Sequence, residues 1–368
     1  MAIEKLRARI DAIDRRIVRL LNDRARAAIR IGAMKDRQNA PAFAPAREEQ
    51  VLRNVEAATR EAGILSPEAV RAIYAEVISA CRATERRLVV AFLGPRGTFS
   101  HYAARSVKWS SLAHRAARQR FGGAVELLPV SSIQAVFTEV AQGRADYGVV
   151  PIENTTEGGI GATLDMFMDS DVKVTAEILV RVHQSLLAAP EAGPIARIYS
   201  KAEVFGQCRI WLANHYPDAR LIDAPSTSHA AEMAARTRDA AAIAHEEAAE
   251  LHGLRILHRA IEDNPFNMTR FYVLGKTSPA PSGRDKTSTL CFIKDEPGAL
   301  HHILTPFWRN EINLTKIESW PSKRKAWDYC FFIDFEGHSE EPRIARALEQ
   351  VRRKCSQLKI LGSFPAAT

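Results

Sequence analysis

The chain has 368 residues, of which 46% are hydrophobic and 26% are charged, and its formal net charge is +8. This length predicts two or three domains, each with enough residues for a core of its own. No apolar run is long enough for a membrane-spanning helix, and the N-terminus, MAIEKLRARIDAIDRR, has a charged helical pattern in place of the apolar segment of a signal peptide. We therefore expect a cytoplasmic protein that does not bind membranes.

The basic charge, with a pI near 9.3, fits either nucleic acid or a small polyanionic substrate. Because the arginines are scattered along helices beside Glu and Asp, we expect no nucleic acid as a partner. The five cysteines are odd in number and scattered without a CxxC pair, which argues against disulfides and against a zinc site. We expect reduced thiols, no metal and no cofactor. The densest basic run, residues 114–120 (HRAARQR), predicts a solvated face.

The first 87 residues predict three helices. Apolar side chains recur with helical spacing through residues 3–36, which contain no proline, so this segment predicts one amphipathic helix about 50 Å long. The segment QNAPAFAP ends that helix, and two further helices follow, the last of them beginning at a cap formed by Ser66 and Pro67. Because three helices cannot bury so long an apolar stripe, the pattern predicts dimerisation.

From residue 88 the pattern changes to strand, glycine turn and helix, which predicts an α/β domain over residues 88–276. A first set of βα units, a second set and a return through IEDNPFNMTRFYVLG predict two lobes joined by two crossings, with a cleft between them. In this interpretation a polar turn carries Thr269 and Arg270 at the mouth of the cleft. The alternative is a capped turn with a solvated arginine.

A linker rich in Pro, Ser and Gly, TSPAPSGRDK, separates this domain from the C-terminal residues. Residues 287–364 then alternate in the order strand, helix, strand, strand, helix, strand. This order predicts a ferredoxin-like α+β domain.

Charged side chains of the helical domain can converge on an anionic ligand. Arg24 and Lys35 are eleven residues apart, almost three helical turns, so they share one face of the helix. Arg7 lies about 25 Å from Arg24 along the helix and would have to come from a partner chain. Arg47 and Glu48, at the start of the second helix, can join the same pocket. The alternative is a salt-bridged helix surface.

Two segments of the α/β domain, GPRGTFS and PIENTTEGG, each follow a strand and are expected to open a helix. Free backbone amides at such helix starts bind carboxylates, so these segments can hold an anionic substrate while Arg270 forks one of its carboxylates. The alternative is that each segment is only a helix cap. The candidate binding residues are Thr98, Ser100, Asn154, Thr155 and Thr156.

Several segments occur in an order that resembles one known family. They are LRARIDAIDRRIVRLLNDRARAAIRIGAMK, GPRGTFS, GVVPIENTTEGG, IEDNPFNMTRF, DKTS, GAL and LKILGSFP. Over nearly its whole length the chain resembles the bifunctional chorismate mutase/prephenate dehydratases of phenylalanine biosynthesis. The resemblance implies an all-α mutase domain over 1–87, a two-lobed dehydratase domain like a periplasmic binding protein over 88–276, and a ferredoxin-like ACT regulatory domain over 287–364.

The resemblance also implies two reactions, chorismate to prephenate and then prephenate to phenylpyruvate with loss of carbon dioxide and water. The first is a pericyclic rearrangement, which needs a compact substrate and stabilised charge on the breaking ether oxygen. By resemblance, Arg7 of the partner chain, Arg24 and Arg47 bind the two carboxylates. Lys35 points at the ether oxygen, and Glu48 holds the ring hydroxyl.

Three further positions of the helical domain match or depart from the family pattern. Glu85 matches a residue that faces the ether oxygen, where it must be protonated to donate a hydrogen bond. Cys81, a further substrate contact, stands where a serine is common, and Ala44 stands where some members have an aspartate.

For the second reaction, the resemblance makes Thr269 the residue that donates a hydrogen bond or a proton to the departing hydroxyl. Arg270 would orient a substrate carboxylate, and Phe271 would pack the turn. Ser200 and Gln207 match the family segment at SKAEVFGQC, although that segment departs from the more frequent Ser-His-Pro-Gln opening.

The C-terminal domain resembles the family's phenylalanine site in two motifs, GALH and ESWP, of which the second has Trp320 in place of the usual arginine. The residues implied are Gly298, Ala299, Leu300, His301, Glu318 and Ser319. A two-lobed ligand-sensing regulator with a helical dimerisation arm is the alternative from another class. Against it, the first helix has no helix-turn-helix break followed by a recognition helix.

Overall fold

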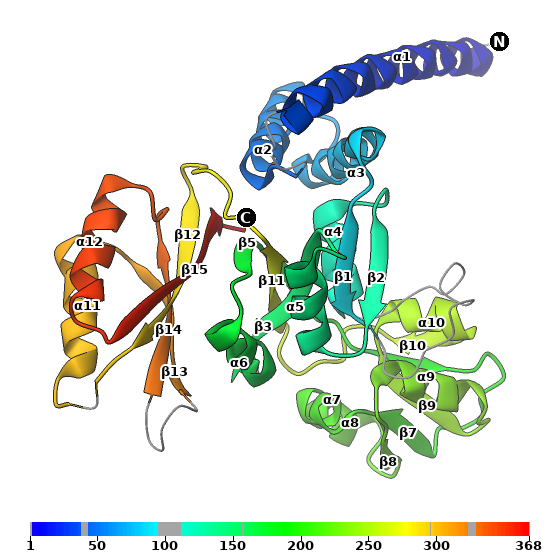
Figure 1. The fold of residues 1–368 in the computed structure, drawn as a ribbon. Coiled ribbons are helices and arrows are strands. Elements are labelled where there is room, and N and C mark those ends of the chain that lie inside the picture. The colour runs from blue at the N-terminus through cyan, green and yellow to red at the C-terminus, as the bar shows by residue number, and fades with distance from the viewer. Residues whose placement is uncertain are drawn as a thin grey trace.

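The computed structural model describes residues 2–37, 43–94, 112–156, 158–294, 296–322 and 329–367. A helical region comes first, a two-lobed α/β region follows, and a four-stranded C-terminal region packs beside the first lobe (Figure 1). Among the described residues, none of the helices combines the length and the hydropathy that a membrane span requires. Each of the five cysteines lies in the described part and is a free thiol.

The helical region has the three predicted helices. They are α1 (Ala2–Arg37), α2 (Pro45–Ala62) and α3 (Pro67–Glu85). Ser66 caps α3 as predicted, because its side chain accepts a hydrogen bond from Ala69 N at 3.1 Å. Helix α1 projects away from the remainder of the chain (Figure 1), and its apolar stripe stays in solvent. Its side chains between 47% and 65% exposed include Ile3, Leu6, Ile10, Ile13 and Ile17.

The first lobe is built on a six-stranded sheet of order β2-β1-β3-β11-β5, with β4 paired to β3. Strand β1 runs parallel to β2 and β3, whereas β11 runs antiparallel to β3 and β5. The strands are β1 (Val89–Leu93), β2 (Glu126–Val130), β3 (Tyr147–Asn154), β4 (Gly158–Gly159), β5 (Lys173–Arg181) and β11 (Met268–Gly275). The helices are α4 (Leu112–Phe121), α5 (Ile133–Gln142) and α6 (Gly161–Asp169).

The second lobe has a five-stranded sheet of order β10-β6-β9-β7-β8. Its strands are β6 (Ser185–Ala188), β7 (Arg197–Ser200), β8 (Arg220–Asp223), β9 (Ala240–Ala244) and β10 (Arg255–His258). Its helices are α7 (Ala202–Gln207), α8 (Arg209–His215), α9 (Thr227–Ala235) and α10 (Glu246–His252). The chain crosses between lobes after β5 and again after β10, so the prediction of two lobes with two crossings is confirmed.

The polar turn predicted at Thr269 and Arg270 ends before these residues. Thr269 and Arg270 belong to β11, which lies between β3 and β5, and both residues are buried. A β-branched residue and two aromatics within four positions favour a strand, so pairing in the sheet extends to residue 268. Because side chains alternate along a strand, Thr269 and Phe271 lie on one face of the sheet, and Arg270 and Tyr272 lie on the other.

The C-terminal region has the predicted βαββαβ order. Its elements are β12 (Asp285–Phe292), α11 (Ala299–Arg309), β13 (Leu314–Pro321), β14 (Tyr329–Glu336), α12 (Pro342–Arg352) and β15 (Gln357–Pro365), and the strand order is β13-β14-β12-β15. Helices α11 and α12 cover the outer face of this sheet (Figure 1). The inner face shares one core with the first lobe, where Leu290 and Phe364 pack in the same cluster as Val174 and Tyr272.

Candidate active sites

The predicted cations of α1 lie along a helix that has few neighbours within the chain. Arg7 is exposed, whereas Arg24 and Lys35 are half-buried. Glu85 of α3 packs against α1 at Gly32, where an added Cβ would lie 2.8 Å from Glu85 Cγ. The close approach of α1 to α3 therefore requires a glycine at this position.

Glu48 is held by two arginines that the sequence interpretation missed. Arg82 Nη1 donates to Glu48 Oε1 at 2.6 Å, and Arg120 Nη1 lies 3.5 Å from Glu48 Oε2. Arg82 is 5% exposed. One signal was available, because Arg82 falls four residues after Ile78, on the buried face of α3. The two other predicted residues here differ in burial: Cys81 is buried, and Arg47 is exposed and donates to Gln50 at 2.8 Å.

The basic run at residues 114–120 is solvated on one side only, so the predicted solvated face is confirmed only in part. Ala116 and Ala117 are buried in the core, and the Arg120 side chain is only 14% exposed. Burial lowers the pKa of Arg120, and the Glu48 carboxylate opposes that change. Arginine remains charged in proteins, so a buried cation stands where the helical region meets the first lobe.

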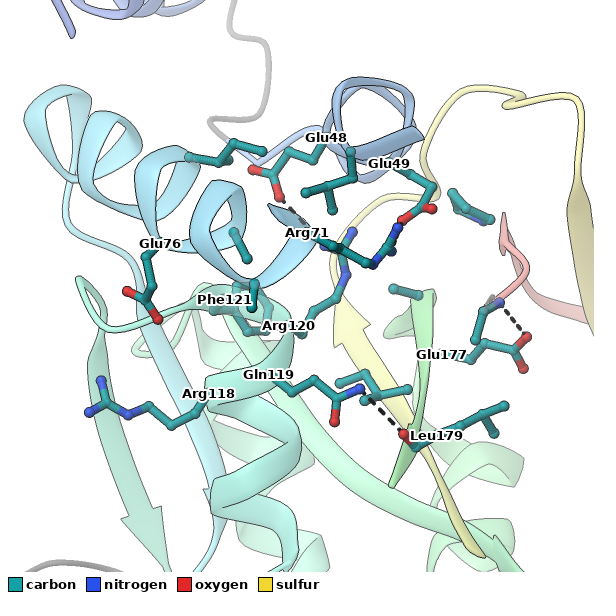
Figure 2. A pocket seen from close by; sticks show the side chains of 18 of the residues that line it. Glu48, Glu49, Arg71, Glu76, Arg118, Gln119, Arg120, Phe121, Glu177 and Leu179 are labelled. Atoms are coloured by element: carbon teal, nitrogen blue, oxygen red, sulfur yellow. Dashed lines mark hydrogen bonds and ion pairs between the residues drawn. The ribbon is translucent and has the colours of Figure 1, made fainter. Parts of the chain in front are cut away.

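A cavity of about 390 Å³ lies at this junction, between α2, α3, α4, β5 and the C-terminal residues (Figure 2). Arg71 projects into it and forms ion pairs of 2.8 Å with both Glu49 and Glu56. Arg120 and Glu177 line it from the first lobe. Charges of both signs therefore surround the cavity, and many of them already pair with one another.

Thr269 belongs to a hydrogen-bonded chain of polar side chains that connects the two lobes. Asn154 Nδ2 donates to Thr269 Oγ1 at 2.9 Å and to Asn267 Oδ1 at 3.0 Å. Asn267 Nδ2 and Gln184 Nε2 both donate to Gln207 Oε1, at 3.1 and 3.2 Å. Gln184 and Asn267 lie on the two crossings, whereas Gln207 ends α7 of the second lobe. The structure thus brings together the predicted residues Asn154, Gln207 and Thr269.

This chain of hydrogen-bonded side chains orients the hydroxyl of Thr269. The oxygen accepts from the Asn154 amide, so the hydroxyl proton is directed away from Asn154 and can be donated. Thr269 is 6% exposed. A hydroxyl in such an environment forms stronger hydrogen bonds than one in water.

The segment PIENTTEGG does not open a helix, contrary to the prediction. Gly158, at φ 81°, allows a tight hairpin in which β4 pairs back on β3, and α6 begins only at Gly161. Asn154 Oδ1 accepts from Thr156 N at 2.8 Å, and Thr155 Oγ1 donates to Phe266 O at 3.0 Å. These side chains order the end of β3. The predicted residues Thr98 and Ser100 lie outside the described residues.

Ser200 is buried in the second lobe, and Phe271 is buried in the first. Ser200 Oγ donates to Ile243 O at 2.8 Å and is fully buried between β7 and β9. Phe271 is 1% exposed in the hydrophobic core of the first lobe and so does not pack a turn.

Arg270 faces the C-terminal region, on the opposite side of β11 from Thr269. Its Nε donates to Glu177 Oε2 at 2.8 Å, and its Nη1 donates to Asp334 Oδ2 at 2.7 Å. Tyr272 donates to the same Asp334 oxygen at 2.8 Å. Because side chains alternate along a strand, the arginine points away from the Thr269 hydroxyl. The prediction that Arg270 binds a substrate carboxylate beside Thr269 is therefore wrong. Arg270 instead forms an ion pair that joins two regions of the chain.

The two predicted effector motifs lie on different elements. Gly298, at φ 82°, precedes α11, with Ala299 buried, Leu300 partly buried and His301 exposed. The second motif lies on β13, where Glu318 pairs with Lys316 at 2.7 Å and Ser319 is exposed.

Trp320, the departure from the family motif, contacts the first lobe. Its Nε1 donates to Asp165 Oδ1 at 2.8 Å, and its ring lies against Gly161, where an added Cβ would meet it at 2.5 Å. The position that usually holds an arginine therefore attaches β13 to α6.

Comparisons with known proteins agree with this architecture. Family models match residues 6–86 as chorismate mutase type II, residues 90–279 as prephenate dehydratase and residues 287–353 as an ACT domain. A bifunctional chorismate mutase/prephenate dehydratase of Aquifex aeolicus is 45% identical over 99% of this chain and 98% of its own.

Two solved structures have the same fold over the last two regions. The prephenate dehydratase of Arthrobacter aurescens, in complex with L-Phe, is 34% identical over 76% of this chain and 90% of its own, with a TM-score of 0.65. A quorum quenching acylase, GqqA, is 28% identical over 76% of this chain and 98% of its own, also with a TM-score of 0.65. From the three family models in this order and the relative that matches from end to end, the chain belongs to the family of bifunctional chorismate mutase/prephenate dehydratases.

Proposed function

We propose that the helical region converts chorismate to prephenate and that the two-lobed region converts prephenate to phenylpyruvate, with loss of carbon dioxide and water. The observation that carries the assignment of the second site is the buried hydroxyl of Thr269, held by Asn154 at the junction of the two lobes. Ligands of two-lobed α/β folds bind in that position.

In the dehydratase reaction, a ring hydroxyl must leave as the carboxylate departs as carbon dioxide, and aromatisation of the ring supplies the driving force. Thr269 donates a hydrogen bond to the departing oxygen. Asn154 orients Thr269, and Gln207 brings the second lobe to the same chain of hydrogen bonds. Closure of the lobes around prephenate then excludes water from the reacting atoms.

In the mutase reaction, the enzyme holds the substrate compact and stabilises negative charge on the ether oxygen. Lys35 supplies the stabilising positive charge, and Arg24 of the same α1 helix binds a substrate carboxylate. Arg7, which also binds a carboxylate, comes from the α1 helix of a second chain. The exposed apolar stripe of α1 supports this assignment, because a second copy of the same helix would cover it. Arg47, Glu48, Cys81 and Glu85 complete the site from α2 and α3.

We assign the C-terminal ACT domain to phenylalanine, which we expect to inhibit the dehydratase reaction. The related dehydratase with bound L-Phe supports this assignment. Gly298, Ala299, Leu300 and His301 form one part of the effector site, and Glu318 and Ser319 form the other. Because Trp320 replaces the usual arginine and already binds Asp165, affinity for the effector is expected to be lower than in relatives that have the arginine.

We place the protein in the cytoplasm as a homodimer or a larger homo-oligomer. Five free thiols, three of which are fully buried, suit a reducing compartment. We expect contacts between the α1 helices of two chains to hold the dimer together.

A single assay tests the function. Purified protein is supplied with chorismate, and the loss of chorismate and the appearance of phenylpyruvate are followed together. We expect both, with prephenate as the intermediate. A ligand-sensing regulator would produce neither product.

A further inference from the structure

The helical region and the first lobe share a core. Phe43, which precedes α2, is 1% exposed, and the centre of its ring lies 4.9 Å from those of Phe121 and Tyr147. Phe121 ends α4 and Tyr147 begins β3, so both partners belong to the dehydratase region. Rings at this separation are closely packed. The start of α2 is therefore fixed by a region that catalyses a different reaction.

Helix α3 lies against the same part of the first lobe. Gly123 N donates to Glu76 Oε2 at 2.9 Å. Gly122 has a φ of 72°, and a Cβ added there would lie 2.5 Å from Ser79 Cβ. The turn after α4 thus approaches α3 as closely as a glycine allows, and the distance between α3 and α4 is fixed.

Glu48, on α2, is bound from both sides of this boundary. Arg82 of α3 donates to one carboxylate oxygen at 2.6 Å. Arg120 of α4, which is labelled with Glu48 in Figure 2, lies 3.5 Å from the other. The guanidinium carbons of Arg82 and Arg120 lie 5.3 and 4.8 Å from the centre of the Phe43 ring. An ionised carboxylate has about four acceptor positions, so Glu48 retains capacity for a substrate hydroxyl.

We propose that Arg120, a residue of the dehydratase region, is a positioning residue of the mutase site. It fixes the carboxylate of Glu48 in the orientation that accepts the ring hydroxyl of chorismate. The inference rests on the role assigned to Glu48 above. Arg82 alone contacts one oxygen, which leaves the carboxylate free to rotate about its last torsion, and the contact of Arg120 with the second oxygen stops that rotation.

The proposal explains why a basic residue is buried at the end of α4. A buried guanidinium is costly unless it has an anionic or aromatic partner, and Arg120 has both in Glu48 and Phe43. Both partners belong to the helical region. The residues of α4 that face this boundary therefore serve the mutase reaction.

The test uses the full chain with Arg120→Gln. Mutase rates are measured over a range of chorismate concentrations, and dehydratase rates are measured separately with prephenate. We expect mutase kcat/KM to fall by about tenfold, mainly through a higher KM, as for the loss of one charge-assisted hydrogen bond. Dehydratase constants should be unchanged, which also shows that the dehydratase region is folded. Arg120→Lys, which keeps the charge, should lie between Arg120→Gln and the wild type.

Arg118→Gln is the matched control, because it removes the same charge from the same helix. Arg118 Nη1 donates to Gly123 O at 3.1 Å, within its own region. Both activities of this variant should equal those of the wild type. If Arg118→Gln loses as much mutase activity as Arg120→Gln, the effect is one of helix charge and the proposal is overturned.

A double-mutant cycle with Glu48→Gln separates positioning from general destabilisation. If Arg120 acts through Glu48, then Arg120→Gln has no further effect in the Glu48→Gln background. An equal loss in both backgrounds, or wild-type mutase constants in Arg120→Gln, would overturn the proposal while leaving the role of Glu48 intact. Wild-type mutase constants in Glu48→Gln alone would instead remove the role of Glu48, and this inference with it.

Discussion

The mutase and dehydratase regions bury their apolar residues in different ways. In the dehydratase region, Val149 and Val273 are fully buried within one chain, whereas Ile13 and Ile17 of α1 are 49% and 47% exposed. The polar residues of the two proposed sites differ in the same way. Thr269 already contacts its neighbours, but the cations of α1 are spread over about 42 Å of helix between Arg7 and Lys35. We therefore expect one site to be complete in a single chain and the other to require a second copy.

The sharpest separation of the two regions is expected from Thr269→Ala. Loss of the hydroxyl removes the donor to the departing oxygen, so dehydratase kcat should fall by about 10²- to 10⁴-fold. Mutase turnover should stay close to that of the wild type, and prephenate should accumulate from chorismate. Product analysis by chromatography measures both rates. Thr269→Ser, which keeps the hydroxyl, should restore most of the dehydratase rate.

The comparison breaks down if both activities of Thr269→Ala fall together in a protein that remains folded. That result would mean that the two reactions share one site.

Charges placed on the α1 stripe should have the opposite selectivity. The double variant Ile13→Asp with Ile17→Asp would bury four carboxylates in a helix pair, so the pair should dissociate. Mutase turnover at low protein concentration should fall by about a hundredfold, and the dehydratase rate with prephenate should not change. Light scattering reports the change in mass.

Ile64→Asp is the control for the α1 variant, because Ile64 is 95% exposed and lies outside the stripe. It should leave both the mass and the mutase rate unchanged. A monomeric double variant that retains full mutase turnover would contradict the requirement for a second chain.

Acid should weaken the dehydratase region through His245. Burial, with help from Arg115 and His183, lowers the pKa of this histidine to about 3, and its Nδ1 accepts from Arg115 Nη1 at 3.1 Å. Because the folded pKa lies below the unfolded value, the unfolded chain binds more protons between pH 6.5 and pH 3. The free energy of unfolding should therefore fall by about 1.4 kcal/mol for each pH unit below about 6.5.

Urea unfolding followed by tryptophan fluorescence, to which Trp211 of the same lobe contributes, measures this dependence. His245→Gln should remove that part of the slope, or about 2 kcal/mol between pH 6.5 and pH 5. His229→Gln, at a half-exposed histidine of the same lobe, should keep it. Equal slopes in the wild type and His245→Gln would show that other groups bind the protons.

The smallest expected effect comes from mixed chains. Arg7→Ala and Lys35→Ala should each lack mutase turnover, but a heterodimer of the two has one intact site of two. Equal mixing should therefore restore about one quarter of the wild-type rate. Chains with two different affinity tags confirm exchange. Verified heterodimers without turnover would place Arg7 and Lys35 in one site of one chain.

The sequence predicted those features that repeat along the chain. The apolar spacing of α1 and the alternation of strands and helices depend on local geometry, so three regions and two crossings could be found without coordinates. The resemblance to a known family supplied the role of Thr269, and the structure adds Asn267 and Gln184 to its surroundings. These residues lie on the crossings, where no periodic pattern indicates which side chains meet.

The predictions from sequence were wrong mainly for side chains that contact another region. Arg270 was expected at the substrate and Arg120 in solvent, yet both form ion pairs across boundaries, with Asp334 and Glu48. The direction of Arg270 could have been found from the alternation of β11, once residue 269 was placed in a strand. The partner of Arg120 could not, because the packing of α4 on α3 depends on tertiary structure alone.

The opposite orientations of Thr269 and Arg270 limit how this protein can change during evolution. Because the side chains of β11 have a period of two, an insertion or deletion of one residue at its start would exchange the faces of these neighbours. The hydroxyl would then point at Asp334, and the guanidinium would point at Asn154. Length variation among homologues should therefore be absent from β11. We expect the strand to be inherited as one unit of fixed length, since one face carries the proposed catalytic hydroxyl and the other carries a domain contact.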